Sequence, residues 1–132
     1  EMGIETVQIL KDLVAFRTVN GNEHLVTAYI HDLLAAHHID SKFVQYSDNR
    51  DNLVAEFDSG HPGPVLGFSG HADVVHEGVV STWTTPPFAP DVRDNRLYGR
   101  GAADMKGGLA GLTIAFMNLV ESQAIKSGKL RL

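Results

Sequence analysis

The chain has 132 residues, the size of one domain, which is long enough to bury a hydrophobic core. Charged residues make up 20% of it and hydrophobic residues 43%, a composition typical of a folded globular protein rather than a disordered one. The net charge of -5 lacks the excess of Lys and Arg that neutralises phosphates, so we expect no nucleic-acid partner. Because the chain has no cysteine, any metal ligands must be histidines and carboxylates.

The sequence predicts neither a membrane span nor a signal peptide. No apolar run approaches the ~20 residues that cross a bilayer, and the N-terminus lacks a basic and an apolar region. We therefore expect a cytoplasmic protein with no membrane partner. The chain begins with Glu1 and ends on Lys129–Leu132 without a turn or polar tail, so we expect both ends to be cut from a longer chain.

Two helices are predicted in the first 40 residues. From Ile4 to about Val19, apolar residues recur every three or four positions, at Ile4, Val7, Leu10 and Val14. The segment Asn20–Asn22 ends this helix, and Asn22 is predicted to cap a second one that runs to about His38.

Strands follow the two helices. The segments Lys42–Tyr46 and Asn52–Phe57 flank a turn-rich stretch and predict a hairpin, and Val65–Ser69 is an apolar run that predicts a short buried strand. Residues 74–96 hold three of the five prolines and the single tryptophan. They predict a long irregular excursion, which in a compact domain is usually functional.

A third helix is predicted from Asp104. Its residues are apolar nearly all round, which is typical of a buried helix. A turn then leads into Lys129–Leu132, where a strand begins. Helices mixed with short strands predict a layered α/β domain.

The segment His71–Asp73 follows the predicted strand Val65–Ser69. In an extended chain residues i and i+2 point the same way, so the Asp73 carboxylate can reach the His71 imidazole. A metal-bound histidine needs such a partner, which fixes its tautomer and raises its basicity. Taken alone, His-x-Asp is more typical of a polar strand end at the surface than of a metal site.

Asp104 also has an ordinary interpretation, as a carboxylate at the positive end of a helix dipole. Gly99-x-Gly101-x-x-Asp104 resembles a dinucleotide fingerprint, but a carboxylate at that place would repel the pyrophosphate, which disfavours a nucleotide site. We interpret the remaining histidines as ordinary exposed residues on the second helix or in loops: His24, His31, His37, His38, His61 and His76.

Read together, these pieces resemble one family of metallopeptidases, that of aminoacylase, acetylornithine deacetylase and succinyl-diaminopimelate desuccinylase. The resemblance is specific over about residues 66–112, and the order of elements before them is compatible with it. The motifs that carry it are His71-Ala72-Asp73-Val74-Val75, Trp83, Pro87-Phe88-x-Pro90 and Leu97-Tyr98-Gly99-Arg100-Gly101-Ala102-x-Asp104-Met105-Lys106-Gly107-Gly108.

The resemblance implies a site of two zinc ions, for which cobalt or manganese can substitute. His71 would be a terminal metal ligand, Asp104 would bridge the two ions, and Asp73 would be the catalytic carboxylate that orients His71. A bridging anion between two cations ~3.5–4 Å apart is chemically sensible, because such a pair polarises an amide carbonyl and lowers the pKa of water. The family also implies a cis peptide bond between Asp104 and Met105.

The same resemblance implies a layered α/β/α zinc-peptidase-like catalytic domain, of which residues 1–132 are the N-terminal part. The general-base glutamate, the remaining ligands and an inserted dimerisation domain would lie outside this chain. We expect the intact protein to be a homodimer through that domain and the fragment itself to be inactive.

The expected activity of the intact protein is hydrolysis of the amide bond of a small N-acyl amino acid, of the succinyl-diaminopimelate desuccinylase or acetylornithine deacetylase type. An aminoacylase, dipeptidase or carboxypeptidase of the same family, acting on an acyl amino acid or a peptide, is the nearest alternative. A non-catalytic binding domain that retains the fold is an alternative of another class.

Overall fold

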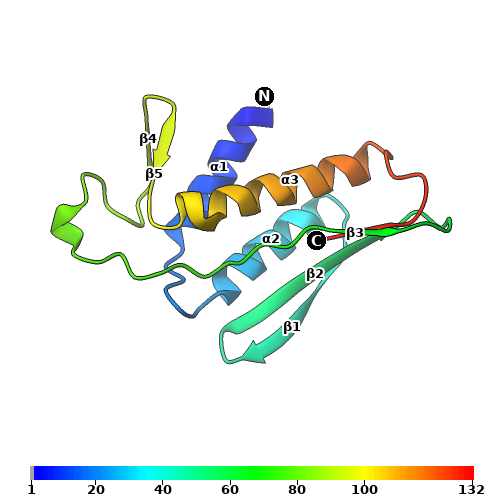
Figure 1. Cartoon of the computed structure of the whole chain (residues 1–132), viewed down its shortest axis with the longest axis horizontal. Coiled ribbons are helices and arrows are strands. Elements are labelled where there is room, and N and C mark those ends of the chain that lie inside the picture. Colours follow the sequence, from blue (N-terminus) through cyan, green and yellow to red (C-terminus); the bar gives the residue numbers. More distant parts are fainter. Residues whose placement is uncertain (1) are drawn as a thin grey trace.

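Three helices and a four-stranded sheet form the body of the molecule, seen in Figure 1. The structure, a computed structural model, describes residues 2–132, and side chains from residue 5 onward. In chain order the elements are α1 (Met2–Ala15), α2 (His24–Ala36), β1 (Ser41–Ser47), β2 (Arg50–Asp58), β3 (Val65–Gly67), the short helix η1 (Val80–Thr82), β4 (Asp91–Arg93), β5 (Arg96–Tyr98), the turn Ala102–Lys106, α3 (Gly107–Glu121) and β6 (Lys129–Arg131).

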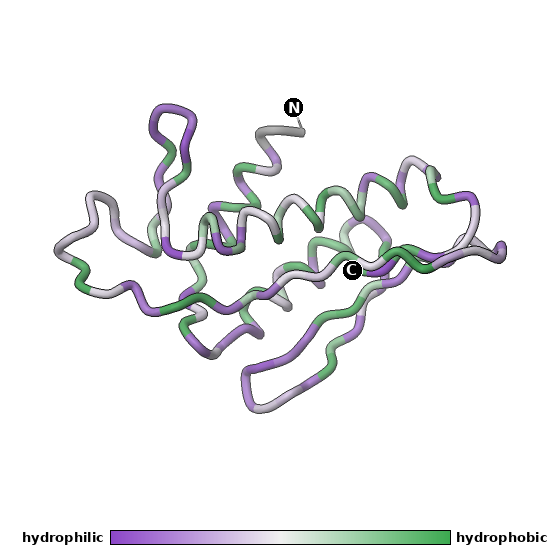
Figure 2. Tube along the Cα trace, viewed as in Figure 1, coloured by the Kyte–Doolittle hydropathy of each residue, from purple (hydrophilic) through white to green (hydrophobic). Residues whose placement is uncertain are grey.

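The sheet has the strand order β1-β2-β6-β3. β1 pairs with β2 in an antiparallel hairpin, β2 pairs antiparallel with β6, and β3 runs parallel to β6. β4 and β5 form a separate two-stranded hairpin, and hydrophilic residues occupy its tip (Figure 2). The parallel β3–β6 pair is joined by the long connection that contains α3, so this helix crosses over the sheet.

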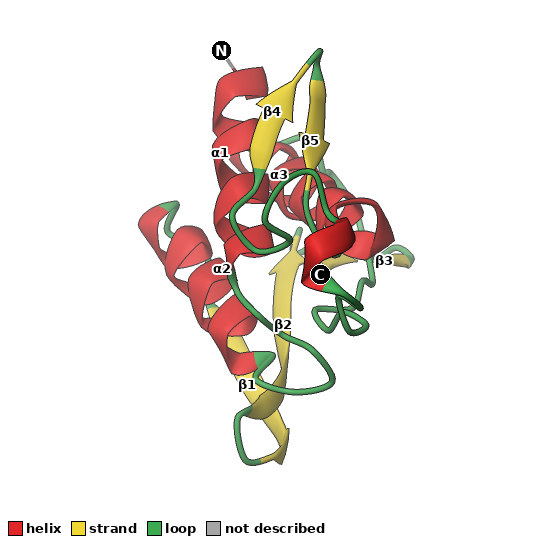
Figure 3. Ribbon diagram, turned by 90° about the vertical axis from the view of Figure 1, so that its left-hand side faces the viewer, coloured by secondary structure: helices red, strands yellow, loops and turns green. Residues whose placement is uncertain are grey.

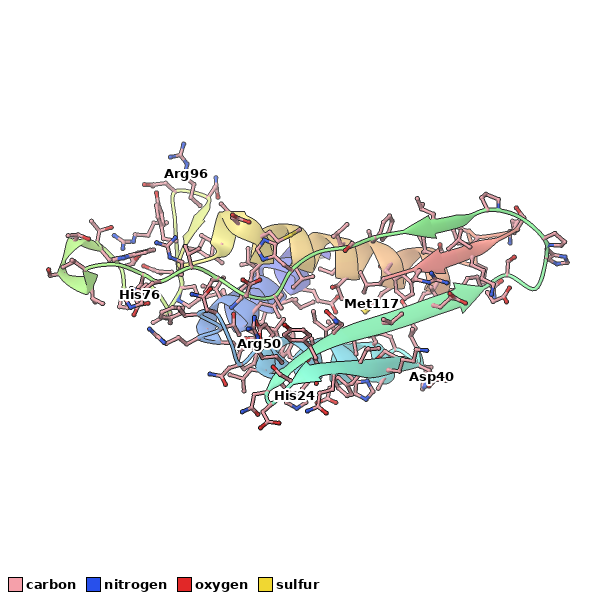
Figure 4. The ribbon with its side chains drawn as sticks, turned by 60° about the horizontal axis from the view of Figure 1, so that its bottom comes forward. His24, Asp40, Arg50, His76, Arg96 and Met117 are labelled. Carbon is pink, nitrogen blue, oxygen red and sulfur yellow. The ribbon has the colours of Figure 1, made fainter. Side chains whose placement is uncertain are left out.

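The helices cover one face of the sheet. Figure 4 shows the strands in front of the helices, and Figure 3 shows α1 and α2 beside β2. The buried core lies between these layers and includes Ile9, Leu13, Val26, Ile30, Leu34, Leu109, Phe116, Met117 and Leu130. The fold is therefore mixed α/β, as predicted. In the part of the chain that is described, no helix is long and apolar enough to cross a membrane.

α1 ends four residues earlier than predicted. Its buried residues are Ile9, Leu13 and Val14, whereas Val7, predicted on the same apolar face, is 42% exposed. The side chain of Ile4 lies outside the described residues. The helix ends at Ala15, and beyond it the Thr18 carbonyl and the Asn20 N–H form backbone hydrogen bonds with Val74, which an α-helical backbone could not make.

α2 is present, but Asn22 does not cap it. Asn22 adopts a left-handed backbone with φ of 58°, and Glu23 takes the position before the helix without capping it through its side chain. The Glu23 carboxylate instead accepts hydrogen bonds from Arg50 at 2.8–3.2 Å. The capping prediction was wrong because a capping residue has an extended backbone, whereas that of Asn22 is left-handed.

The predicted hairpin is confirmed as β1 and β2, and both strands are longer than predicted. The predicted strand at Val65–Ser69 is shorter, and its burial was predicted wrongly. Val65 is 50% exposed and Leu66 56% exposed, because β3 is the last strand of the sheet and residues 5–132 place few side chains over it.

The excursion over residues 74–96 is mostly irregular, as predicted, but it ends in the β4–β5 hairpin, which was not predicted. Asp94 and Asn95 form its turn, both with positive φ, and this residue pair between two short strands is the signal that could have revealed it.

α3 begins at Gly107 rather than at Asp104. Asp104 and Met105 have non-helical backbone angles, and the peptide bond between them is cis, as the resemblance implied. Asp104 therefore lies in a turn that precedes the helix. The helix itself is buried along one face, through Leu109, Phe116 and Met117 among others, rather than all round.

Candidate metal centre

Three side chains from two distant segments meet where the chain leaves β3. His71 Nε2 lies 2.9 Å from Asp104 Oδ1, and His71 Nδ1 lies 3.0 Å from the Asp73 carbonyl oxygen and 3.3 Å from Asp73 Oδ1. The structure thus brings together the three residues that the sequence singled out. Asp73 does face the imidazole, as predicted, although its carbonyl is nearer than its carboxylate.

The surroundings of His71 favour its protonated form. Burial lowers the pKa of His71, but the hydrogen bond with Asp104 and the carbonyl and carboxylate of Asp73 outweigh this effect and hold the pKa above its ordinary value. The His71 side chain is 46% exposed and that of Asp104 89% exposed, so both remain accessible from solvent.

Backbone geometry aims Asp104 at His71. Gly101, just before the turn, has φ of 79°, and a Cβ there would lie 2.3 Å from a methyl carbon of Val74. A glycine is therefore required for the chain to pass beside the His71 segment. The contact is continued by Met105, whose sulfur accepts a hydrogen bond from the His71 backbone N–H at 3.3 Å.

The centre opens into a shallow cavity of about 200 Å³, whose lining includes His71, Asp73, Asp104 and Arg100. The Arg100 guanidinium stacks 5.1 Å from the centre of the Trp83 ring, and its buried Nε has no hydrogen-bond partner in the structure. Trp83 in turn donates from its indole N–H to the Glu77 carbonyl at 2.8 Å. The excursion is thereby held against the rim of the cavity.

The chemistry of His71 and Asp104 fits part of a zinc site. If Nδ1 donates to the Asp73 carbonyl, Nε2 keeps a lone pair, and this nitrogen and the Asp104 oxygen are of the types that zinc binds. A zinc ion normally takes three or four protein donors. Among the described residues no group of three or more His, Cys, Asp or Glu side chains is arranged to hold a metal ion, so these two residues supply a share of the ligands.

Three of the other histidines, His24, His31 and His37, bind side chains from other parts of the chain. His24 Nδ1 pairs with Asp51 at 2.7 Å, and His31 Nδ1 with Ser41 at 2.7 Å. His37 pairs with Glu121.

The Glu77 carboxylate, next to His76, accepts two hydrogen bonds from Arg17 at 3.0 and 3.1 Å. Figure 4 shows Arg50 and His24 near the turn end of the β1–β2 hairpin, opposite Asp40, with His76 on the excursion beyond that end.

Two buried polar residues lie beside the centre, and the sequence motif that contains Lys106 gave neither of them a role in the site. Thr18 and Lys106 are both 0% exposed. The sequence carried no signal for Thr18. Lys106 could have been noticed as a charged residue at the start of an apolar helix, where its burial by α1 lowers its pKa to about 8.

Comparison with known proteins identifies the family. Residues 67–132, half of the chain, match peptidase family M20/M25/M40, and this match includes His71, Asp73 and Asp104. The chain belongs to this family.

Curated relatives extend the likeness over nearly the whole chain. A Staphylococcus epidermidis protein named "Probable succinyl-diaminopimelate desuccinylase" is 47% identical over 128 residues, which are 97% of this chain and 31% of that protein. A Wolbachia pipientis protein named "Succinyl-diaminopimelate desuccinylase" is 35% identical and covers 98% of this chain and 32% of its own length. The chain therefore spans about a third of the length of these relatives.

Solved structures agree on the fold. An M20 family metallo-carboxypeptidase from Sulfolobus solfataricus superposes with a TM-score of 0.81 over 97% of this chain and 30% of its own, at 19% identity. At that identity the likeness establishes a shared mixed α/β fold.

Proposed function

We propose that this chain is the N-terminal part of the catalytic domain of a metal-dependent amidohydrolase, which removes the acyl group from an N-acyl amino acid. The type we favour is a succinyl-diaminopimelate desuccinylase or acetylornithine deacetylase. The observation that carries the proposal is the 2.9 Å approach of His71 Nε2 to Asp104 Oδ1, in a chain of the M20 family whose relatives include proteins named desuccinylases.

In this proposal His71 and Asp104 hold zinc, and Asp73 orients His71. The Asp73 carbonyl accepts from Nδ1 and directs Nε2 toward the Asp104 carboxylate, 2.9 Å away. Two zinc ions, when bound, would polarise the amide carbonyl and lower the pKa of water toward neutrality. Cobalt or manganese would serve as substitutes for zinc.

The rest of the machinery belongs, in this proposal, to parts of the intact protein beyond this chain. These parts are the general-base glutamate, the remaining metal ligands and a dimerisation domain through which the protein forms a homodimer in the cytoplasm. The length of the relatives, about three times that of this chain, leaves room for them.

Replacing Asp104 by alanine in the intact protein tests the metal assignment. We expect Asp104→Ala to lose bound zinc and to lower turnover by at least ~100-fold, because a bridging carboxylate and the metal's contribution are lost together. Metal content is measured by mass spectrometry on protein purified without chelators. Asp40→Ala, which removes an exposed carboxylate just before β1, is the matched control and should keep both zinc and activity. Full zinc loading with normal turnover in Asp104→Ala would refute the assignment.

A substrate panel tests the reaction. We expect hydrolysis of succinyl-diaminopimelate or acetylornithine to exceed that of simple acetyl amino acids, a dipeptide and a tripeptide. The panel is compared by kcat/KM, which measures discrimination between substrates directly. A clear preference for peptides would favour a dipeptidase or carboxypeptidase of the same family, and zinc binding with no turnover on any substrate would favour a non-catalytic domain.

A further inference from the structure

One short segment of the chain contacts both halves of the candidate metal centre. Residues Phe16–Asn20, here called the bracket, follow α1 and lie between the His71–Val74 segment and the turn that carries Asp104. At its middle, Thr18 is completely buried. The bracket is far from both segments in sequence, so its contacts are tertiary.

On one side, the bracket fixes the backbone on both sides of Asp73. The Thr18 hydroxyl donates to the Ala72 carbonyl at 2.7 Å, and the Val74 N–H donates to the Thr18 carbonyl at 2.9 Å. A third bond, from the Asn20 N–H to the Val74 carbonyl at 3.3 Å, completes a short parallel bridge. The orientation of the two peptide groups that flank Asp73 is thus set from the bracket.

On the other side, the bracket receives Lys106, two residues after Asp104. The Lys106 ammonium donates to the Phe16 carbonyl at 2.8 Å and is completely buried. This carbonyl lies just beyond the C-terminal end of α1, where unpaired carbonyls and the helix dipole favour a cation. Burying an ammonium is costly, whereas a methionine would fill similar space without that cost. The role of Lys106 is therefore its directed hydrogen bond to the Phe16 carbonyl rather than apolar packing.

The direct links between the two ligand segments are weaker. Apart from the approach of His71 to Asp104 itself, the backbone N–H of His71 donates to the Met105 sulfur at 3.3 Å, and a thioether is a weak acceptor. The stronger bonds run through the bracket.

We propose that Thr18 and Lys106 are positioning residues, which through the bracket hold His71 and Asp104 at the separation that lets both bind the same metal centre. The proposal rests on the proposed function, because it takes His71 and Asp104 as zinc ligands. Neither Thr18 nor Lys106 touches the metal. Each acts by holding the backbone next to a ligand, in the same way that outer hydrogen-bond partners tune metal sites.

The test measures zinc affinity of the intact protein, by competition with a chromophoric chelator, for Thr18→Val, Thr18→Ser and Lys106→Met. Loss of an outer partner typically weakens metal binding by roughly 10–100-fold, and we expect this for Thr18→Val and Lys106→Met. Thr18→Ser keeps the hydroxyl and should restore affinity close to that of the unchanged protein. Melting temperatures of the metal-free proteins, measured in parallel, report folding separately. If Lys106→Met does not fold, the Thr18→Val and Thr18→Ser pair decides.

Thr113→Val is the matched control. Thr113 is also completely buried and also donates one bond from its hydroxyl, at 2.8 Å, but its acceptor is the Leu109 carbonyl within α3. The Thr113→Val variant should lose about as much stability as Thr18→Val and keep the zinc affinity of the unchanged protein. Unchanged affinity in Thr18→Val and Lys106→Met, or an equal loss in Thr113→Val, would overturn the positioning role alone. If the unchanged protein and Asp104→Ala bind zinc equally, the proposed function fails and the positioning role fails with it.

Discussion

At the scale of single residues, the Asp73 side chain and backbone contact the same imidazole nitrogen. The Asp73 carbonyl is 3.0 Å from His71 Nδ1 and the carboxylate 3.3 Å. The carbonyl alone can therefore fix the tautomer of His71, and the carboxylate adds its negative charge. This division separates orientation of the ring from its basicity.

Asp73→Asn in the intact protein separates the two effects. The carbonyl remains, so we expect zinc to stay bound, whereas the lost charge should lower turnover by roughly 10–100-fold. Metal content and kcat, measured on the same preparation, check this. If purified Asp73→Asn protein contains no zinc, the prediction is contradicted, since that result would make Asp73 a ligand rather than a partner of His71.

Gly101 is a second residue whose replacement has a definite expected outcome. Its φ of 79° is unfavourable for other residues, and a Cβ would lie 2.3 Å from Val74. Gly101→Ala should destabilise the protein by ~2–5 kcal/mol, the sum of left-handed strain and overpacking.

Gly111 provides the opposite case, since it is exposed within α3 and a Cβ there meets no atom within 4 Å. Gly111→Ala should stabilise by ~0.5–1 kcal/mol. Urea denaturation of both variants gives the two values. Equal stabilities of the two variants would show that the chain can rearrange around Gly101.

At the scale of elements, the sequence predicted those with a strong local signal. Helical periodicity located α1, α2 and α3, and the turn-rich stretch between two apolar segments located the β1–β2 hairpin. The errors occurred where tertiary contacts override local preference. α1 ends early because Thr18 bonds to Ala72, 54 positions away. Asn22 does not cap α2 because its backbone is left-handed, and the His24 N–H there donates to the Asn49 carbonyl.

The candidate site was predicted by its motif, whereas its supporting contacts were not. Neighbours in sequence reveal His71 and Asp73, and family resemblance adds Asp104. No local pattern links Phe16 to Lys106, which are separated by 90 positions and joined through a backbone carbonyl that every residue carries. Such a contact can be found only from the fold.

The pairing of β2 with β6 has an electrostatic part that depends on pH. Arg131 and then Lys129, at 2.9 and 3.2 Å, hold the pKa of the Glu56 carboxyl below its usual value of 4.5. A carboxyl with a lowered pKa in the folded state stabilises the fold above its unfolded pKa, and this contribution is lost as the pH falls through the folded pKa.

Glu56→Gln should therefore lower the melting temperature slightly near neutral pH, and its difference from the unchanged protein should shrink as the pH falls below 4.5. Melting curves over a pH series measure this. Asp48→Asn, in the turn between β1 and β2, is the control and should show no such trend. A difference that persists undiminished in acid would indicate that Glu56 contributes through packing.

At the scale of the whole molecule, a groove separates part of β2 from the segment that follows β3. A groove of about 660 Å³ is lined on one side by residues 50–54 of β2 and on the other by residues 67–73, which lead to the metal centre. Arg131 and Leu132 line it as well, and Leu132 still pairs with Ala55 at 2.8 and 2.9 Å. Within the described part of the chain, residues 50–54 pair with β1 on one side, and no strand pairs with them on the side of the groove.

The 132-residue chain by itself should bind zinc weakly and have no activity. His71 and Asp104 are two zinc donors, whereas one zinc ion normally takes three or four from protein. In the proposed function the general base also lies elsewhere, and loss of a general base alone costs ~10²–10⁴-fold in rate. We therefore expect calorimetric titration to show weak zinc binding and an acyl-amino-acid assay to show no turnover, with circular dichroism confirming that the helices are formed. Tight binding of two zinc ions with measurable hydrolysis would contradict this. That result would mean that ligands come from His61, from His76 and Glu77, or from a second copy of the chain.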